Sequence, residues 1–412
     1  MKIAMATEYY WPRDLGGSEW STHYLAKGLI EAGHQVLVVT PNYGSGKSEV
    51  KDKIKILRFP FPKKNKKNRP FSPFWHTNFL WILLTTYYLI KICREERVDV
   101  LHLQGKYYSP AGFFVKRFVK IPVILTVRDY QLICNYGFCI WENSKSCSLL
   151  SYFKDDFTKY YQSYVFKKNV VTLVLNLAFA IRGRIVRDIY KYFALHLDKI
   201  VCISYAQAKI YKSNKFKNVS VIYNSTEFKI SYIKPKNKIV YAGRLTPGKG
   251  VELLLQALPA VLRTFPKLKL VIFGEGFLKN NLGVMSKKYA KSRIKFAGHV
   301  SHKRLLGEYA SSLATVMPSV WPEPFGRIAL ESISKGTPVV ATRAGGLTEI
   351  VEDGRTGFLC RPTATELSRA IIKVIQYNSS LRLKIRKNFS RLKKKFQDNT
   401  IKQYFKIYKD FL

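Results

Sequence analysis

The sequence has few acidic residues for its length. Only 27 Asp and Glu stand against 70 Lys and Arg in 412 residues, which gives a formal net charge of +43. So strong a positive field attracts anions of every kind, including nucleic acid, phosphorylated substrates and anionic membranes. The scarcity of carboxylates therefore indicates anionic partners and leaves the choice among them open.

The chain also lacks a signal peptide and a hydrophobic run long enough to span a bilayer. Residues 1–6 have the pattern of a short strand rather than of a leader. The apolar runs at residues 79–92 and 170–181 are shorter than the ~20 residues that a span needs. They predict buried or surface-lying helices. We expect a cytoplasmic protein, with peripheral attachment to the inner face of the plasma membrane as the alternative.

Residue pairs with metal-binding spacing are absent as well. The six Cys include no Cys-x-x-Cys pair, and Asp-x-Asp occurs nowhere. Cys134, Cys139 and Cys147 fall close together, but the stretch between them contains no His that would complete a metal site. A structural loop, a disulfide and a metal site stay open for these three residues, and no metal is predicted for the chemistry.

Strand-like and helix-like patterns alternate along the chain. The first strands are predicted at residues 2–7, 35–40, 98–104 and 123–127, with a helix at residues 18–32. The alternation restarts after a polar, proline-containing stretch at residues 225–237. Such repeats predict an α/β protein with doubly wound domains. The expected parts are an N-terminal domain over residues 1–230, a second domain over residues 231–392 and a final helix over residues 393–412.

Residues 323–331 carry the most specific pattern, a Pro/Gly loop that leads into a helix. Glu323 lies in the loop, and Glu331 follows more than one turn into the helix. Between them the helix N-terminus offers N–H groups and a positive dipole end, which suit a phosphate. Two acceptors around a phosphate site predict a nucleotide-sugar as the ligand. An amphipathic helix with two solvated Glu would show the same spacing.

The segments around this loop extend the pattern. Arg244 and Lys249 lie in a Gly/Pro loop after a predicted strand, a position that suits a diphosphate. Glycine-containing turns follow downstream, at residues 336–338, 345–346 and 353–357. In this order and spacing the chain resembles the retaining glycosyltransferases with a GT-B fold and a Glu-x7-Glu motif. The resemblance implies two facing Rossmann-like domains with an interdomain cleft.

The resemblance also implies a role for each motif residue. Arg244 and Lys249 would bind the diphosphate of the donor and stabilise it as it leaves. Glu323 would contact the donor sugar, and Glu331 would hold the ribose hydroxyls. The remaining donor-binding positions are Gly16, Gly17, Gly243, Gly298, Phe325, Gly326 and Arg327. No cofactor is expected besides the nucleoside diphosphate sugar, which is the donor substrate.

One position departs from the family pattern. In the resembled family the strand at residues 123–127 usually ends in His-Asp or a similar His motif, whereas this chain has Arg128 followed by Asp129. An Arg cannot act as a base at neutral pH. Either Arg128 replaces the His as a cation near the leaving group, or the His is not needed. We place Arg128 among the catalytic residues.

These patterns predict a retaining glycosyltransferase that uses a nucleoside diphosphate sugar. The acceptor is expected to be a glycan, a lipid-linked molecule or another hydroxyl compound, in the synthesis of cell-surface polysaccharide or glycolipid. A basic loop at residues 63–69 precedes an apolar helix, and residues 155–192 are predicted to form one basic helical segment around an apolar stretch. Both segments add an anionic membrane surface as a partner. A solvated loop beside a core helix is the other interpretation of the first of these segments.

Three other functions stay open from the sequence. They are a sugar-nucleotide epimerase on the same fold, a basic nucleic-acid binder and a non-catalytic scaffold at a membrane. The aromatic residues lie in apolar segments rather than between Lys and Arg, so no specific nucleic-acid partner is expected.

Overall fold

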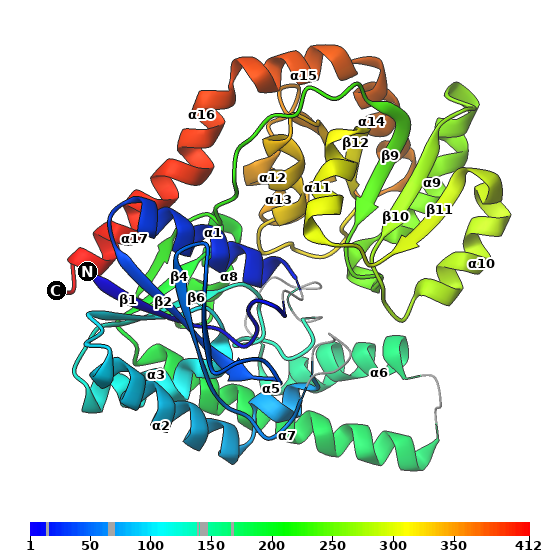
Figure 1. Cartoon of the computed structure of the whole chain (residues 1–412). Coiled ribbons are helices and arrows are strands. Elements are labelled where there is room, and N and C mark those ends of the chain that lie inside the picture. Colours follow the sequence, from blue (N-terminus) through cyan, green and yellow to red (C-terminus); the bar gives the residue numbers. More distant parts are fainter. Residues whose placement is uncertain (14–15, 65–70, 138–139, 141–146, 166–168) are drawn as a thin grey trace. The chain divides into compact units, whose positions relative to one another are not determined.

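The computed structural model divides the chain into two compact units. Unit 1 comprises Met1–Ser225 together with Asn399–Leu412, and unit 2 comprises Thr226–Asp398. The structure describes the whole chain apart from five short segments, which are residues 14–15, 65–70, 138–139, 141–146 and 166–168. Each unit contains one largely parallel sheet with helices packed against it (Figure 1). The α/β, Rossmann-like architecture predicted from the sequence is therefore confirmed.

Unit 1 is built around a sheet that has eight strands within the described residues, in the order β3-β4-β2-β1-β5-β6-β7-β8. The strands are β1 (Lys2–Ala6), β2 (Gln35–Asn42), β3 (Ser48–Lys51), β4 (Ile54–Pro60), β5 (Val100–Leu103), β6 (Val123–Val127), β7 (Lys199–Cys202) and β8 (Val219–Val221). Neighbouring strands are parallel except β3 and β4. The central strands are buried on both faces, which explains their continuous apolar sequences.

Helices cover both faces of this sheet. They are α1 (Gly17–Glu31), α2 (Phe79–Glu95), α3 (Ser109–Phe118), α5 (Leu149–Ser151), α6 (Thr158–Tyr164), α7 (Val170–Leu195), α8 (Tyr205–Ser213) and α17 (Asn399–Lys409). Helices α2, α3 and α7 lie along one face, and α1 and α17 lie along the other (Figure 1). The last helix, α17, is held in unit 1 by buried contacts, among them a 2.7 Å hydrogen bond between Tyr408 and His102.

The basic segment that the sequence predicts as helical over residues 155–192 is not one helix. Helix α6 ends at Tyr164, and its C-cap residue Val165 has an extended backbone. Helix α7 then starts anew after Asn169, whose side chain accepts a hydrogen bond from the backbone N–H of Thr172 at 2.8 Å. The hydroxyl of Thr172 in turn accepts a hydrogen bond from the backbone N–H of Asn169 at 3.1 Å, which completes a capping box. This Asn-x-x-Thr signal marks the second start.

Unit 2 is built around a parallel sheet of six strands within the described residues, in the order β11-β10-β9-β12-β13-β14. The strands are β9 (Lys236–Ala242), β10 (Lys269–Phe273), β11 (Ile294–Gly298), β12 (Ser312–Met317), β13 (Val339–Thr342) and β14 (Gly357–Cys360). The helices are α9 (Val251–Thr264), α10 (Lys279–Ala290), α11 (His302–Ala310), α12 (Arg327–Ser334), α13 (Leu347–Ile350), α14 (Ala364–Gln376), α15 (Asn378–Lys387) and α16 (Phe389–Lys393). The apolar sides of α9 and α14 pack together over the sheet and form the largest part of its core.

Both sheets reverse their strand order beside their first central strand. In unit 1, β2 lies on one side of β1 and β5 lies on the other. In unit 2, β10 and β12 flank β9 in the same way. Open α/β sheets bind ligands at the carboxyl ends of the strands at such a reversal, because the two connecting segments leave in opposite directions there. The order of the strands therefore gives each unit one preferred place for a site.

Candidate functional site

The loops that follow β9 and β12 meet at the reversal in unit 2. Lys249 ends a short 3-10 turn after β9, and Glu323 lies in the loop between β12 and α12. The ammonium of Lys249 donates to Oε1 of Glu323 at 2.6 Å, and the hydroxyl of Ser319 donates to the same oxygen at 2.6 Å. The structure thus joins directly two residues that the sequence predicts to share one site.

The carboxylate of Glu323 is fixed and ionised. Its residue is only 5% exposed. Burial by itself would raise the pKa, but the charge and hydrogen bond of Lys249 outweigh it, and Ser319 and Trp321 add hydrogen bonds, so the pKa of Glu323 lies below its ordinary value. Lys249 is held from a second side by the Trp321 ring, 5.2 Å from its centre.

A close backbone approach keeps these two loops together. Gly250 has a φ of +66° and lies so near Pro318 that a Cβ at Gly250 would sit 2.0 Å from the Pro318 carbonyl oxygen. The carbonyl oxygen of Gly248 accepts a hydrogen bond from the backbone N–H of Val320 at 3.1 Å. A residue with a side chain at position 250 would push the Lys249 loop away from Glu323.

We expect Gly250→Ala to lower the free energy of unfolding by more than about 2 kcal/mol and to abolish activity. The left-handed backbone alone costs roughly 1–2 kcal/mol for a residue with a Cβ, and the clash adds to this cost. Gly283→Ala is the matched control, because a Cβ at this position in α10 meets no atom within 4 Å. It should stabilise the protein by about 0.5–1 kcal/mol. Equal stability of the two variants in urea unfolding would contradict the packing described here.

The Gly345-Gly346 turn packs against the backbone of the Glu323 loop. The backbone N–H of Gly346 donates to the carbonyl oxygen of Glu323 at 2.7 Å. Gly345 has a φ of +55°, and a Cβ there would lie 2.4 Å from the same oxygen. The glycine pair after β13 is therefore needed for the loop after β13 to pack against the Glu323 loop.

Glu331 is also fixed at one of its two oxygens. Its Oε1 accepts a hydrogen bond from His302 Nε2 at 2.9 Å and forms an ion pair with Arg327, whose Nε lies 2.8 Å away, and the residue is only 2% exposed. Burial would raise its pKa, but Arg327 and His302 more than offset burial, so the pKa of Glu331 is lowered. Arg327, which the sequence predicts as a donor-binding residue, contacts Glu331.

His302 is a residue that the sequence analysis missed. It occupies the first position of α11, directly after Ser301, whose hydroxyl accepts from the Arg304 N–H as the cap of that helix. The cap signal Ser-x-x-Arg was visible in the sequence. The contact between His302 and Glu331 was not visible, because the two residues are 29 positions apart in the chain and lie on different helices, α11 and α12.

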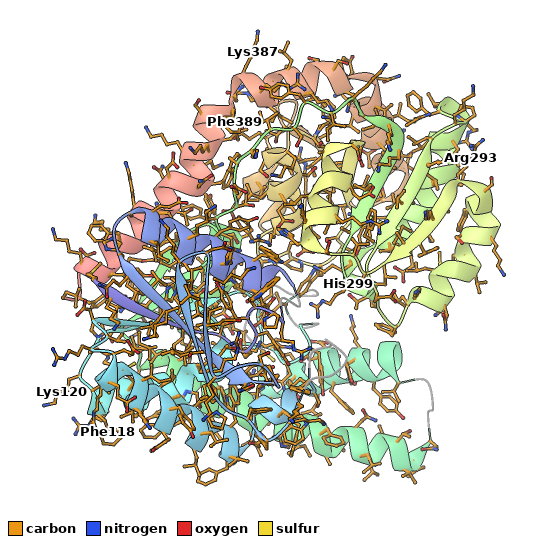
Figure 2. The ribbon with its side chains drawn as sticks, in the orientation of Figure 1. Phe118, Lys120, Arg293, His299, Lys387 and Phe389 are labelled. Atoms are coloured by element: carbon orange, nitrogen blue, oxygen red, sulfur yellow. The ribbon has the colours of Figure 1, made fainter. Side chains whose placement is uncertain are left out.

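The remaining positions predicted in unit 2 lie in loops that touch one another or begin the helix. Gly243 follows β9, and a Cβ at Gly274 after β10 would sit 1.9 Å from the Gly243 carbonyl oxygen. The backbone N–H of Gly274 donates to the carbonyl oxygen of Gly298 at 2.8 Å. Gly298 directly precedes His299, which is labelled in Figure 2. Gly326, with a φ of +110°, is the N-cap of α12. Arg244 is exposed.

Phe325 does not present its ring to a ligand. The residue is only 3% exposed and is part of the core of unit 2. The backbone of Phe325, just before the N-cap residue Gly326, therefore stays the only predicted donor contact of this residue. Gly346 also packs on this backbone, because a Cβ at Gly346 would lie 2.7 Å from the Cα of Phe325.

Unit 1 has a polar cluster at its own reversal, which the sequence analysis did not identify. Glu8 follows β1 and lies against Gly105 after β5, where a Cβ would be 2.1 Å from Glu8 Oε1. Lys106 donates to Oδ2 of Asp129, the second residue after β6, at 2.5 Å. Burial raises the pKa of Glu8, although the neighbouring Lys106 acts in the opposite direction.

The predicted residues of unit 1 border this cluster. Gly16 and Gly17 form the start of α1, and Glu19 follows in its first turn. Burial, with the nearby charge of Glu8, raises the pKa of Glu19 to about 7, although Arg128 and the backbone N–H of Gly16 counteract the rise. Arg128 donates to the carbonyl oxygen of Gln104 at 3.2 Å.

The sequence left a metal site and a disulfide open for Cys134, Cys139 and Cys147. In the part of the chain that the structure describes, no three His, Cys, Asp or Glu are grouped so that they could hold a metal ion. Cys134 and Cys147 are buried, and Cys139 lies outside the described residues. The alternatives for this cysteine cluster therefore stay predictions.

Two parallel-sheet units, each with acidic and basic residues at its strand reversal, are typical of proteins with a GT-B fold. The sequence matches the family described as Glycosyltransferase Family 4 over residues 15–227 and the family described as Glycosyl transferases group 1 over residues 224–396. The chain belongs to the group 1 glycosyltransferases. The predictions of this family and of its fold are confirmed.

Relatives and solved structures agree with this assignment. The chain is 28% identical to an uncharacterised glycosyltransferase of Methanocaldococcus jannaschii over 384 residues, which is 88% of this chain and 85% of that protein. It is 24% identical to glycogen synthase of Mycobacterium tuberculosis over 422 residues, 97% and 92% of the two chains. The fold is similar to that of Anabaena HepE in complex with UDP and glucose (TM-score 0.66, 19% identity, all of both chains). It is also similar to that of sucrose-phosphate synthase from Thermosynechococcus elongatus (TM-score 0.70, 17% identity, 99% and 98% of the chains).

Proposed function

We propose that the protein transfers a sugar from a nucleoside diphosphate sugar to a hydroxyl acceptor with retention of the anomeric configuration. The observation that carries this proposal is the Lys249–Glu323 ion pair at the carboxyl ends of β9 and β12, the ligand-binding position of the unit 2 sheet. The complexes of Anabaena HepE with UDP and glucose and with UDP-glucose support a nucleotide-sugar as the donor.

In this proposal the donor diphosphate lies against the two cations of the β9 loop. The reaction breaks the bond between the anomeric carbon and the diphosphate oxygen, so negative charge grows on the diphosphate. Lys249 and Arg244 stabilise that charge together with the N–H groups at the start of α12. These groups supply the charge that a metal ion supplies in other transferases. Transfer is therefore expected to continue in excess EDTA.

The two acids bind the ends of the donor on either side of the diphosphate. Each carboxylate has one oxygen fixed by neighbouring side chains, Oε1 of Glu323 by Lys249 and Oε1 of Glu331 by His302 and Arg327. We assign the second oxygen of Glu323 to a hydroxyl of the donor sugar and that of Glu331 to the ribose. Because each acid is held in a buried ion pair, it meets the donor already charged and oriented.

The acceptor is assigned to the polar cluster of unit 1. Glu8, Glu19 and Asp129 offer carboxylate oxygens for acceptor hydroxyls, and Arg128 adds a cation beside them. The acceptor oxygen forms the new bond on the same face of the sugar from which the diphosphate leaves, and its proton passes to a diphosphate oxygen. A glycan or a lipid-linked acceptor fits this assignment, and we propose that the enzyme acts in polysaccharide or glycolipid synthesis.

The experiment that tests this function is a screen of nucleotide-sugars with the purified full chain. A thermal shift identifies the donor that stabilises the protein, and release of the nucleoside diphosphate is then followed with glycan and lipid-linked acceptors. Proton NMR of the product gives the anomeric configuration. We expect one donor to be consumed with retention. Inversion at the anomeric carbon, or turnover of no donor by folded protein, would contradict the proposal.

The raised pKa of Glu19 gives a prediction for stability against pH. Its folded-state pKa is about 7, above the ordinary value of 4.5. The group therefore favours the folded state below about pH 4.5, and this contribution is lost as the pH rises through about 7. Since one pKa unit corresponds to about 1.4 kcal/mol and Glu19 is partly solvated, we expect a loss of about 1–3 kcal/mol.

Glu19→Gln removes this titration, so its free energy of unfolding should change less between about pH 5 and about pH 8 than that of the wild type. Glu31→Gln, at the exposed end of the same helix, is the control and should follow the wild type. Parallel pH profiles for the wild type and Glu19→Gln, measured by urea unfolding, would show that Glu19 does not titrate in this range.

A further inference from the structure

Helices α2 and α7 of unit 1 each expose an apolar stripe. The side chains are Phe79, Leu80, Leu83 and Tyr87 on α2 and Ile181, Ile185, Ile189 and Tyr192 on α7. Both sets recur at spacings of three or four residues, so each lies along one side of its helix. Helix α3 packs between the two, and its Phe113 contacts Phe193 of α7 with ring centres 5.3 Å apart. We call the surface formed by these exposed side chains of α2 and α7 the α2–α7 face.

The first half of α7 is exposed on several sides. Residues 170–181 contain no charged residue. Their exposed large side chains are Val170, Val171, Leu173, Val174, Leu175, Leu177, Phe179 and Ile181. A helix that is apolar nearly all round is normally buried in a core or in lipid. This segment packs beside α6 through Tyr161 and Thr172, whose hydroxyls lie 3.4 Å apart.

The segment is too short to span a bilayer. Twelve residues at ~1.5 Å each extend about 18 Å, whereas the hydrocarbon core is about 30 Å thick. Among the described residues, no helix combines the length and the hydrophobicity needed to cross a membrane. An apolar helical surface of this kind lies in the interface, among the headgroups and the first part of the acyl chains.

Basic residues border the apolar area. On α2 the exposed stripe continues from Tyr87 to Lys91 and Arg94. Arg94 donates to the carbonyl oxygen of Phe118 at 3.1 Å, which joins this end of α2 to the end of α3. There Lys120 is exposed beside Phe118, and both point outward (Figure 2).

The other end of α2 also carries a cation. Lys63 lies 4.6 Å from the centre of the Trp75 ring, just before the helix. The acids of this surface are neutralised by neighbours, Glu95 by Lys91 at 3.8 Å and Asp188 by Arg184 at 2.9 Å. The border of the apolar area is therefore positive at both ends of α2.

We propose that the α2–α7 face docks on an anionic lipid bilayer, with the first half of α7 inserted at the level of the headgroups. An apolar centre with a cationic border is complementary to acyl chains below a layer of lipid phosphates. A second copy of this chain is a poorer occupant, because it would bring one cationic border against another. The proposal does not depend on sugar transfer, since binding is measured without donor or acceptor.

Sedimentation with vesicles tests the proposal on the full chain. We expect the wild type to bind vesicles that contain phosphatidylglycerol and to bind pure phosphatidylcholine vesicles at least tenfold less, with the difference shrinking in high salt. Val174→Ser/Phe179→Ser should weaken binding at least tenfold, because it removes two apolar side chains from the interface. These residues are 58% and 63% exposed, so the variant should fold normally.

A matched control uses equally exposed apolar residues of unit 2. Val284→Ser/Leu383→Ser, at positions 68% and 51% exposed, should bind like the wild type. In addition, the fluorescence that Phe179→Trp adds to that of the six native Trp should be quenched by brominated lipid, and the fluorescence that Val284→Trp adds should not. Absence of binding to anionic vesicles, or equal binding of the two Ser variants, would overturn the proposal. A dimer in analytical ultracentrifugation that only Val174→Ser/Phe179→Ser dissociates would assign the face to a second copy instead.

Discussion

Replacing Lys249 by methionine is expected to lower the turnover of sugar transfer by about 100- to 1,000-fold, or about 2.7–4 kcal/mol in the barrier. Methionine keeps most of the volume of the side chain and removes its charge. In the proposed mechanism Lys249 faces the diphosphate on which negative charge grows, and Glu323 and the Trp321 ring hold it in place. The loss should appear in kcat and in kcat/KM, measured by release of the nucleoside diphosphate.

The control for this variant is Lys238→Met. Lys238 forms a similar, partly buried ion pair with Glu308 in the same unit, but it lies near the amino end of β9 rather than beyond its carboxyl end. Both variants lose an ion pair, so both should lose a comparable amount of stability. Only Lys249→Met should lose turnover. If the two variants lost activity to the same degree, the effect would be structural and the phosphate role of Lys249 would be wrong.

Glu323→Gln is expected to have the second largest effect, a fall in kcat of about 100-fold with less than a tenfold change in donor affinity. The amide keeps the shape of the side chain and its hydrogen bond from Ser319. It removes the negative charge that faces the donor sugar, where positive charge develops as the bond to the diphosphate breaks. A change seen mainly in turnover would show that this charge acts in the transition state.

Calorimetry with the unreactive nucleoside diphosphate and steady-state kinetics with the whole donor separate the two effects. Glu308→Gln is the matched variant, since it neutralises the acid of the Lys238–Glu308 pair. It should change neither quantity. An unchanged kcat in Glu323→Gln would exclude contact between this carboxylate and the reacting sugar.

The sequence predicted the fold class correctly, and it placed Lys249 and Glu323 in one site, where the structure joins them by an ion pair. Their role in binding a donor stays a prediction. Lys249 and Glu323 follow strands in Gly/Pro loops, and such loops at the carboxyl ends of parallel strands share one edge of a sheet. Gly250 and Gly345 show why those loops were recognisable, because both adopt left-handed backbone angles at points where another loop touches them. A left-handed backbone angle is a local requirement for glycine, so it can be recognised in a short stretch of sequence.

Other parts of the site depend on strand order, which the sequence does not display. Glu8, Gly105 and Lys106 meet because β1 and β5 are neighbours, although β2, β3 and β4 separate them in the chain. The pairing of His302 with Glu331 likewise depends on how α11 packs against α12. No single segment contains a signal for such contacts, since the energy that selects them comes from packing of the whole sheet.

The predicted helix over residues 155–192 failed for a different reason. Its basic and apolar residues favour a helix throughout, but Asn169 and Thr172 form a capping box that starts a second helix. The Asn169–Thr172 cap is a short local signal, whereas the basic and apolar residues that favour one helix extend over the whole segment. Its effect is large, because it defines where the exposed apolar half of α7 begins.

The most direct test of the central claim is calorimetric titration of the full chain with UDP, GDP and ADP. The account predicts that the wild type binds one of them, that Lys249→Met and Arg244→Ala each weaken this binding at least tenfold, and that Lys238→Met binds like the wild type. Binding of no nucleoside diphosphate by the folded wild type would contradict the account. Equal affinities in the wild type and the Lys249→Met/Arg244→Ala double variant would contradict it as well.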